Sequence, residues 1–299
     1  MLVVTLSIKN LTPHFGAEIT DLDLTQEIDD ETISDIKTAL ETYSVLVFRE
    51  QRFDDQSQTA FSARFGPLEH TVYKPEGDGG NHVADITNVD FRTNQIYPKG
   101  HSRLKSNSGN EMWHTDSSFK PTPAYCSMLS GREVPPLGAD TQFGSCRVAY
   151  DALPDAEKLR LEGLVAEHSY GYSRSLVAGY KPPEQTLQEV PPVRHAVIRS
   201  NPANGLKNFY TGSHASHIIG APIEEGRQAL RDLVESATQP NRVYVHNWRQ
   251  FDFVIWDNRC VLHRGTPFDT ANHRRVMRRT TVAGAGPTVN EAGEALAMA

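Results

Sequence analysis

Residues 253–263 read FVIWDNRCVLH, and this stretch decides the predicted fold. The apolar run Phe253–Trp256 is typical of a buried strand, and the polar turn Asp257–Arg259 ends it. A second short strand, Val261–Leu262, leads directly to His263. Strand, turn and strand therefore place His263 where a loop-facing ligand is expected.

Outside this stretch, most apolar segments are also short and are separated by turns that contain Gly, Pro and Asn. Many short strands late in the chain favour a β-sandwich or jelly roll, so we expect a mainly β fold with peripheral helices. No GxGxxG motif follows a strand, which weakens a dinucleotide-binding interpretation. The other predicted strands are Ser44–Phe48, Tyr125–Ser130, Thr141–Phe143, Val243–His246 and Arg275–Val282.

Helical periodicity and capping residues are confined to a few segments. The predicted helices are Asp30–Tyr43, Asp54–Phe65, Pro154–Glu167 and Glu224–Thr238.

Two long stretches, Lys74–Glu111 and Val177–Asn208, look like loops, and loops of this length are usually lids, binding loops or disordered segments. We expect the first to be a lid that orders when substrate binds. From Gly284 the chain is rich in Gly and Ala with few apolar anchors. The sequence therefore predicts a single domain over residues 1–283 and a loose tail over residues 284–299.

Composition and charge exclude several classes of protein. The chain has 299 residues, of which 38% are hydrophobic and 22% charged, as in an ordinary globular enzyme. Its net charge of −7 argues against a nucleic-acid binder, which needs a basic surface. No apolar run is long enough to span a bilayer, and Met1–Asn10 does not have the features of a signal peptide. Three widely spaced cysteines favour a reducing compartment, so we expect a cytoplasmic protein.

Trp113-His114-Thr115-Asp116 is the first candidate metal motif. On an extended strand, residues two apart point to the same face, so His114 and Asp116 can hold one ion together. With a second His from a distant strand, they would complete a set of two His and one carboxylate, which binds Fe(II) and leaves three positions open. The alternative is a structural role without a metal, in which His114 is partly buried and Asp116 caps a turn.

Context favours the metal site, because His263 supplies the missing imidazole and Arg275 follows about a dozen residues later. A guanidinium makes two parallel hydrogen bonds to a carboxylate. A 2-oxo diacid that binds iron with one end needs such a partner at the other. Arg274, Arg275, Arg278 and Arg279 crowd together in an otherwise acidic chain, which also suggests a local anion site.

Several motifs, in this order and spacing, resemble the family of taurine dioxygenase and aryloxyacetate (2,4-dichlorophenoxyacetate) dioxygenase, which are Fe(II)/2-oxoglutarate-dependent oxygenases. The resemblance covers roughly Ser44 to Val282. The motifs are Ser44–Arg49, Phe65–Glu69, Trp113–Asp116, Gly138–Thr141, Ala149–Pro154, Trp256–Arg259, His263, Arg274-Arg275 and Arg278-Arg279.

The resemblance implies a double-stranded β-helix, the jelly-roll core of that family, with His114, Asp116 and His263 as iron ligands. It also implies that Thr141 and Arg275 hold the distal carboxylate of 2-oxoglutarate. One extra residue in the following loop leaves Arg274 as the alternative anchor. The implied cofactors are Fe(II), 2-oxoglutarate and O2, and the implied reaction hydroxylates a C–H bond, with cleavage wherever the hydroxylated product is unstable.

The resemblance also marks candidate residues for the primary substrate. Asn110, His70 and Tyr73 match positions on the substrate side of taurine dioxygenase. Lys74, His214 and His217 match the aryloxyacetate branch instead, although either His is equally well explained as a surface loop residue.

Arg279 lies four residues after Arg275 on the same predicted strand, so both side chains face the same way. We expect Arg279 to hold an anion of the substrate, and a salt bridge to a protein carboxylate is the alternative. The predicted substrate is therefore a small organic anion. The residues within the motifs resemble the aryloxyacetate branch more closely, which favours an aryloxyalkanoate-like carboxylate over a taurine-like sulfonate.

Two rival functions remain at this stage. A Zn(II) hydrolase could use the same three ligands, but Arg275 would then have no role. A jelly-roll metal-binding protein without turnover would not need three open metal positions. We also expect a homo-oligomer with no nucleic-acid or membrane partner.

Overall fold

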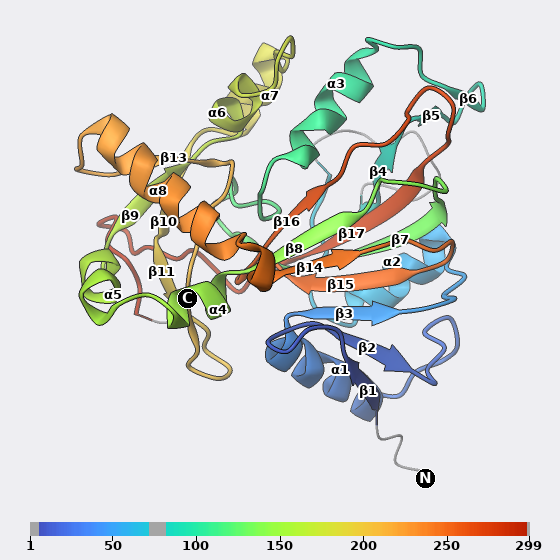
Figure 1. The fold of residues 1–299 in the computed structure, drawn as a ribbon, viewed down its shortest axis with the longest axis horizontal. Coiled ribbons are helices and arrows are strands. Elements are labelled where there is room, and N and C mark those ends of the chain that lie inside the picture. Colours follow the sequence, from blue (N-terminus) through green and yellow to red (C-terminus); the bar gives the residue numbers. More distant parts are fainter. Residues whose placement is uncertain (1–5, 72–81, 298–299) are drawn as a thin grey trace.

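The computed structural model of the chain describes residues 6–71 and 82–297, and a seven-stranded sheet lies at its centre (Figure 1). All neighbouring strands of this sheet are antiparallel except β2 and β3, which are parallel. Every residue of β3 is buried, because its apolar run is covered on both faces. In sheet order the strands are β1 (Ser7–Asn10), β2 (Ala17–Thr20), β3 (Val45–Phe48), β15 (Phe253–Asp257), β7 (Ala124–Glu133), β17 (Val276–Ala283) and β4 (Ala84–Thr87).

A second, three-stranded sheet packs on one face of the large sheet. Phe143 and Val261 of the small sheet share one core with Val47, Val254 and Met277 of the large sheet. The facing sheets confirm a mainly β protein with its apolar residues between two layers. In sheet order the strands of the small sheet are β14 (Val243–His246), β8 (Thr141–Ser145) and β16 (Val261–Gly265).

Two helices, α1 (Asp30–Tyr43) and α2 (Asp55–Ala63), cover the other face of the large sheet. Asp29 starts α1 because its side chain accepts a hydrogen bond from the Thr32 amide at 2.7 Å. A capping box of Asp54 and Ser57 starts α2. Both helices confirm the prediction, to within two residues at either end of α2.

Residues 146–242 are inserted between β8 and β14 and pack around a core of their own, to the left of the sheets in Figure 1. Leu230 and Leu233 of the longest helix contribute to this core, as the periodicity of that helix predicts. The elements of this lobe are α4 (Cys146–Asp151), α5 (Asp155–Leu161), β9 (Val165–His168), α6 (Tyr170–Ser175), α7 (Glu184–Glu189), β10 (Val193–Ala196), β11 (Ile198–Ser200), β12 (Lys207–Phe209), β13 (Ala215–Ile218), α8 (Ile223–Ala237) and the 3-10 turn η3 (Pro240–Arg242).

The helix predicted over Pro154–Glu167 is too long. It ends at Leu161, and Gly163 takes a left-handed conformation with φ of +76°. That conformation ends the helix and turns the chain into β9, which pairs with β10 and β13. The sequence conceals this strand because its four residues show no alternation strong enough to compete with the helix signal.

Both predicted long loops contain regular structure. Of the first, residues 74–81 lie outside the described part of the chain. The remainder forms β4, β5 (Val89–Asp90), β6 (Gln95–Ile96), α3 (Ser102–Ser108) and the 3-10 turn η2 (Gly109–Glu111). The second contains α7, β10, β11 and the start of β12. These strands have two to four residues and depend on distant partners, so local patterns do not reveal them.

The C-terminal segment, expected to be a loose tail, makes defined contacts as far as Leu296. The Thr288 side chain is fully buried and donates or accepts at His195 Nδ1, 2.9 Å away, while Leu296 N donates to Thr288 O at 3.0 Å. The buried Thr288 hydroxyl and several backbone hydrogen bonds therefore hold a segment that lacks large apolar anchors. No helix within residues 6–71 and 82–297 is long and apolar enough to cross a membrane.

Candidate functional site

His114, Asp116 and His263 come together in the structure, and their potential ligand atoms all lie within 4.8 Å of one another. Backbone pairing brings the two histidines together. His114 N donates to His263 O at 3.0 Å and His263 N donates to His114 O at 2.8 Å, which forms an isolated antiparallel bridge to the middle residue of β16. All three residues are buried. His114 and Asp116 thus lie close together as predicted, although they do not share a strand, because His114 makes an isolated bridge and Asp116 begins a turn.

The two imidazoles present bare nitrogen atoms to the carboxylate. His114 Nε2 lies 3.9 Å from Asp116 Oδ1, and His263 Nε2 lies 3.7 Å from Asp116 Oδ2, both too far for a hydrogen bond. The Met112 carbonyl lies 2.7 Å from His114 Nδ1, which fixes the proton there and leaves Nε2 as the lone-pair nitrogen. This spacing suits three ligands that share one ion between them.

Electrostatics favour the protonation states that a metal needs. Burial lowers the pKa of His114, and Arg279 and Arg174 lower it further against the opposing effect of Asp116. Burial likewise holds the pKa of His263 well below its usual value. For Asp116, burial raises the pKa, but the charge of Arg279, together with smaller effects that include the hydrogen bond from Ser127, outweighs burial and keeps the pKa well below the usual range. Neutral imidazoles beside an ionised carboxylate are the forms that coordinate a divalent cation.

A hydrogen-bonded chain orients the Asp116 carboxylate. Ser127 Oγ donates to Asp116 Oδ2 at 2.7 Å, and Asn258 Nδ2 donates to Ser127 Oγ at 2.9 Å. Asn258 Oδ1 also accepts from the Asp116 amide at 3.1 Å and from Trp256 Nε1 at 3.0 Å. Asn258 is completely buried, so its amide holds both the backbone and the side chain of a candidate ligand in place.

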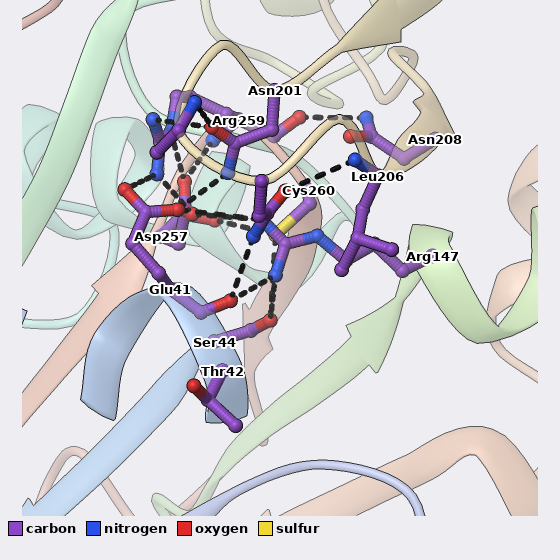
Figure 2. A network of polar contacts seen from close by, with 12 residues as sticks. Glu41, Thr42, Ser44, Arg147, Asn201, Leu206, Asn208, Asp257, Arg259 and Cys260 are labelled. Atoms are coloured by element: carbon purple, nitrogen blue, oxygen red, sulfur yellow. Dashed lines mark hydrogen bonds and ion pairs between the residues drawn. The ribbon is translucent and has the colours of Figure 1, made fainter. Parts of the chain in front are cut away.

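The residues on either side of Asn258 belong to a different polar cluster. Asp257 and Arg259 form a two-pronged pair, with Arg259 Nε and Nη2 donating to the two carboxylate oxygens at 2.9 and 2.8 Å. Arg259 Nη2 also donates to Glu41 Oε1 at 2.6 Å, and Arg147 Nη2 donates to Asp257 Oδ2 at 3.4 Å. Figure 2 shows these four charged side chains converging with Ser44 and Asn201. We call Glu41, Arg147, Asp257 and Arg259 the salt-bridge cluster.

The salt-bridge cluster ties together parts of the chain that are far apart in sequence. It joins the end of α1, the start of α4, the loop between β11 and β12, and the turn that carries Asn258 (Figure 2). Arg147 Nη1 donates to Glu41 O at 2.7 Å, and Asn208 Nδ2 donates to Arg259 O at 2.8 Å. The turn is thus anchored on one side by ion pairs and presents Asn258 to the candidate metal ligands on the other.

The candidate 2-oxoglutarate residues lie on β8 or near its start, and β8 pairs with the strand that carries His263. Thr141 is on β8, two residues from Phe143, which pairs with His263, and its Oγ1 accepts from Trp248 Nε1 at 2.9 Å. Arg275 Nη2 approaches the Ala139 carbonyl at 3.5 Å, which brings it close to the start of β8. Burial lowers the pKa of Arg275 to about 10, with partial compensation from Asp140.

Arg274 and Arg275 differ in their partners. Arg274 makes a two-pronged pair with Glu133, at 2.6 and 2.9 Å, on the rim of the protein. No carboxylate lies within 4.0 Å of the Arg275 guanidinium in the described ranges. A half-buried guanidinium that pairs with no carboxylate of the described residues is the one able to take a carboxylate from a ligand.

A cavity of about 140 Å³ opens beside the candidate metal ligands. His114, Asp116, Asn110, His70 and His214 all line it, so four positions expected on the substrate or metal side share one space with Asp116. His214 is fully packed between aromatic rings, its ring 4.8 Å from that of Phe119. It is therefore a wall residue of the cavity and not a surface loop residue.

The remaining predicted substrate residues differ in where they lie. His217 lies on β13, beside Glu167 and Ser216, and does not line the cavity. Tyr73 and Lys74 lie outside the described residues. Arg279 lines the cavity but forms an ion pair with Asp116, which is the alternative that the sequence left open for it.

Several cavity residues had no signal in the sequence. Phe119, Tyr170 and Arg174 form one wall, and the last two belong to α6, a helix of six residues. Asn258 stood in a recognised motif, yet its contact with Asp116 depends on a turn that comes close only in the folded chain. Short helices and contacts across the fold leave no periodic pattern, so only the structure brings these residues together.

Comparisons with known proteins agree on one family of relatives. Residues 7–281 match the family described as "Taurine catabolism dioxygenase TauD, TfdA family". The alpha-ketoglutarate-dependent 2,4-dichlorophenoxyacetate dioxygenase of Cupriavidus pinatubonensis is 40% identical over 276 residues, which cover 91% of this chain and 96% of that protein. The (S)-phenoxypropionate/alpha-ketoglutarate-dioxygenase of Sphingobium herbicidovorans is 34% identical over 293 residues, covering 92% and 93%.

A solved structure extends this similarity to three dimensions. It is described as AAD-2 in complex with Mn(II) and N-oxalylglycine, and it superposes with a TM-score of 0.88 at 39% identity. The superposition covers 96% of this chain and 100% of that one.

Proposed function

This chain belongs to the TauD/TfdA dioxygenase family and is an Fe(II)- and 2-oxoglutarate-dependent dioxygenase, and we propose that it hydroxylates a C–H bond of a small aryloxyalkanoate carboxylate. The observation that carries the site assignment is the group of two bare Nε2 atoms facing one carboxylate, with all ligand atoms within 4.8 Å. We take the two facing sheets as the double-stranded β-helix of the family. The relatives that act on phenoxy acids favour this substrate class over a sulfonate.

We propose that His114, Asp116 and His263 hold Fe(II). The donor set fits, because two neutral imidazoles and one ionised carboxylate suit Fe(II) and leave three positions open. Bound iron and 2-oxoglutarate would supply the oxidising power, with oxygen taken from O2 and 2-oxoglutarate converted to succinate and CO2. Ser127 and Asn258 would keep the Asp116 carboxylate in its coordinating orientation.

We propose further that Thr141 and Arg275 bind the distal carboxylate of 2-oxoglutarate. Arg275 is supported over Arg274 because Glu133 already occupies the Arg274 guanidinium. Trp248 donates to the Thr141 hydroxyl, which leaves that hydroxyl's own proton available for an anion. Asn110, His70 and His214 would line the space for the primary substrate, with Tyr73 and Lys74 as further candidates.

The experiment is release of succinate from 2-oxoglutarate under air, with phenoxyacetate as primary substrate. Succinate formation is expected to require Fe(II) and ascorbate and to rise when phenoxyacetate is added. A Zn(II) hydrolase or a binding protein would release no succinate under any of these conditions. If taurine stimulates release and phenoxyacetate does not, the enzyme is a sulfonate dioxygenase and the proposed substrate class is wrong.

Two wider expectations complete the proposal. Cys126, Cys146 and Cys260 are all free and buried, which supports a reducing, cytoplasmic location. A homo-oligomer is expected as well, and light scattering on the purified protein measures its mass directly.

A further inference from the structure

Four permanently charged cations line the cavity among the described residues, and three of them already have a carboxylate partner. Each of these pairs neutralises its own charge and leaves little attraction for an anionic ligand. The pairs are Arg103 with Asp85 at 3.8 Å, Lys120 with Glu69 at 2.6 Å, and Arg279 with Asp116.

Arg174 is the fourth cation, and no carboxylate of the described chain lies within ion-pair distance of it. Its guanidinium donates to the Ser106 carbonyl at 3.2 Å and lies over the Tyr170 ring, 5.0 Å from the ring centre. Its Nε is buried and has no hydrogen-bond partner in this part of the structure. A partly buried cation with a spare donor is costly unless something else pairs with it.

The chain makes room for this guanidinium at Gly109. A Cβ atom at that position would lie only 1.8 Å from Arg174 Nη1. Gly109 has an ordinary right-handed backbone conformation, with φ of −59°, so its backbone does not require glycine. A side chain at this position would therefore push the Arg174 guanidinium out of its present place, next to the 3-10 turn that carries Asn110.

Aromatic rings connect Arg174 to the candidate metal ligands. The Tyr170 ring lies 5.1 Å from that of Phe119, which lies 4.8 Å from the His214 ring. The His214 ring in turn lies 6.3 Å from that of His114. An apolar wall with a cation at its end matches a ligand that has an aromatic ring and an anionic group.

We infer that Arg174 binds the carboxylate of the primary substrate, with Gly109 providing the space and the Phe119–Tyr170 wall packing against the substrate's ring. This inference rests on the proposed function, because it assigns the anion of that substrate to one residue. A guanidinium recognises a planar carboxylate with two parallel hydrogen bonds, and Arg174 has the free donors to make them.

The test compares phenoxyacetate with its neutral amide, 2-phenoxyacetamide, on the parent and on Arg174→Gln. Binding is measured by calorimetry without O2, on enzyme loaded with Fe(II) and 2-oxoglutarate. The variant is expected to bind phenoxyacetate about 10- to 100-fold more weakly, because it loses hydrogen bonds to a charged group. Binding of the amide and the 2-oxoglutarate KM are expected to stay within about twofold of the parent.

Gly109→Ala is a second variant, which keeps the charge of Arg174 but displaces its guanidinium. It is expected to reproduce the selective loss of phenoxyacetate binding. The matched control is Arg227→Gln. The Arg227 guanidinium lies 5.4 Å from the ring centre of Tyr172, which is on α6 like Arg174, but Arg227 does not line the cavity. The control is expected to bind both ligands as the parent does.

The outcomes separate this inference from the proposed function. Equal weakening of acid and amide by Arg174→Gln, or no weakening of either, makes Arg174 a packing residue and overturns the inference. If the parent binds and oxidises phenoxyacetate, the proposed function survives that result. If Arg174→Gln selectively loses phenoxyacetate that the parent binds but does not oxidise, Arg174 is an anion site and the proposed function fails. A parent that does not bind phenoxyacetate overturns both.

Discussion

The salt-bridge cluster and the candidate metal centre lie on opposite sides of the turn that carries Asn258. They differ in how their charged and polar groups are paired. In the salt-bridge cluster, two arginines face two carboxylates, and all four carboxylate oxygens accept hydrogen bonds from protein groups. In the candidate metal centre, one carboxylate faces two imidazoles whose Nε2 atoms have no hydrogen bond. In the first region every carboxylate oxygen has a partner within the chain, although Arg147 Nε has none among the described residues. In the second region the two imidazole Nε2 atoms are left without a hydrogen bond to any described residue.

The difference teaches how a structural polar cluster can be told from a functional one. Burial alone does not separate them, since Asp257 and Asp116 are both almost inaccessible. The state of the neighbouring groups does, because ion pairs satisfied within the chain stabilise the fold, whereas unsatisfied ligand atoms await a partner from outside. Substitutions on the two sides should therefore change different measurable quantities.

The largest expected effect is the loss of turnover in His263→Ala. Removing one of three ligands should abolish Fe(II)-dependent succinate formation, because two ligands hold the ion too weakly. Metal binding provides a second measurement, since a ligand that binds only the folded state raises Tm. The parent should gain Tm on addition of Fe(II) without O2, and the variant should not. Normal succinate formation by the variant would show that the metal lies elsewhere.

Asp257→Asn tests the other side of the turn and should act on stability. It leaves Arg147 and Arg259 buried against a neutral amide, which is expected to lower the free energy of unfolding by about 3–5 kcal/mol. Urea denaturation measures this change. Asp155→Asn is the matched control, because that carboxylate is fully exposed and its loss should change stability by less than about 0.5 kcal/mol. Equal effects of the two substitutions would contradict the structural role of the cluster.

Asn258 lies between the two regions, so Asn258→Ala should affect both Fe(II) binding and the stability of the fold. Loss of the amide that orients Asp116 is expected to weaken Fe(II) binding by about 10- to 100-fold. The buried Trp256 and Asp116 donors also lose their acceptor, which should cost about 1–3 kcal/mol of stability. Metal titration and urea denaturation of the same preparation measure the two effects. A variant that changes only one of them would mean that the two regions are not joined through this residue.

Arg275→Lys should raise the KM for 2-oxoglutarate by about tenfold, equivalent to about 1.4 kcal/mol, because lysine keeps the charge but loses the two-pronged geometry. Arg274→Lys is the control, since Arg274 is occupied by Glu133 on the rim. If Arg274 were the anchor, Arg274→Lys would raise the KM for 2-oxoglutarate and Arg275→Lys would leave it unchanged.

The smallest expected effect is a contribution to acid sensitivity from the salt-bridge cluster. Burial raises the pKa of Asp257, but Arg259 and Arg147 outweigh it and keep the net pKa below its ordinary value. A carboxyl with a depressed pKa in the folded state stabilises the protein above its unfolded pKa, which is about 4, and this stability is lost as the pH falls through the folded pKa. The free energy of unfolding, measured from pH 6 to pH 3, should therefore fall more steeply in the parent than in Asp257→Asn.

Local patterns predicted the elements whose signals are local. The 14 residues of α1 carry both a cap and an apolar face, and their bounds were predicted correctly. Strand geometry predicts that His114 and Asp116 lie close together, and they do, although Asp116 begins a turn and does not continue a strand. Their meeting with His263 follows from the family motifs. By contrast, Arg259 contacts Glu41 across 218 residues, and Arg174 fits against Gly109 only in the folded chain. Such contacts depend on the three-dimensional arrangement of the elements, which no periodic pattern encodes.

The placement of residues 146–242 as an insertion between two neighbouring strands has an evolutionary consequence. Tyr170, Arg174 and His214 belong to this insertion, whereas His114, Asp116 and His263 lie outside it. Under the proposed assignments, mutations in the insertion would alter residues beside the substrate and leave the three candidate metal ligands in place. Exchanging this segment between relatives would therefore replace Tyr170, Arg174 and His214 together, while Asn110 and Phe119 of the same cavity would stay with the rest of the chain.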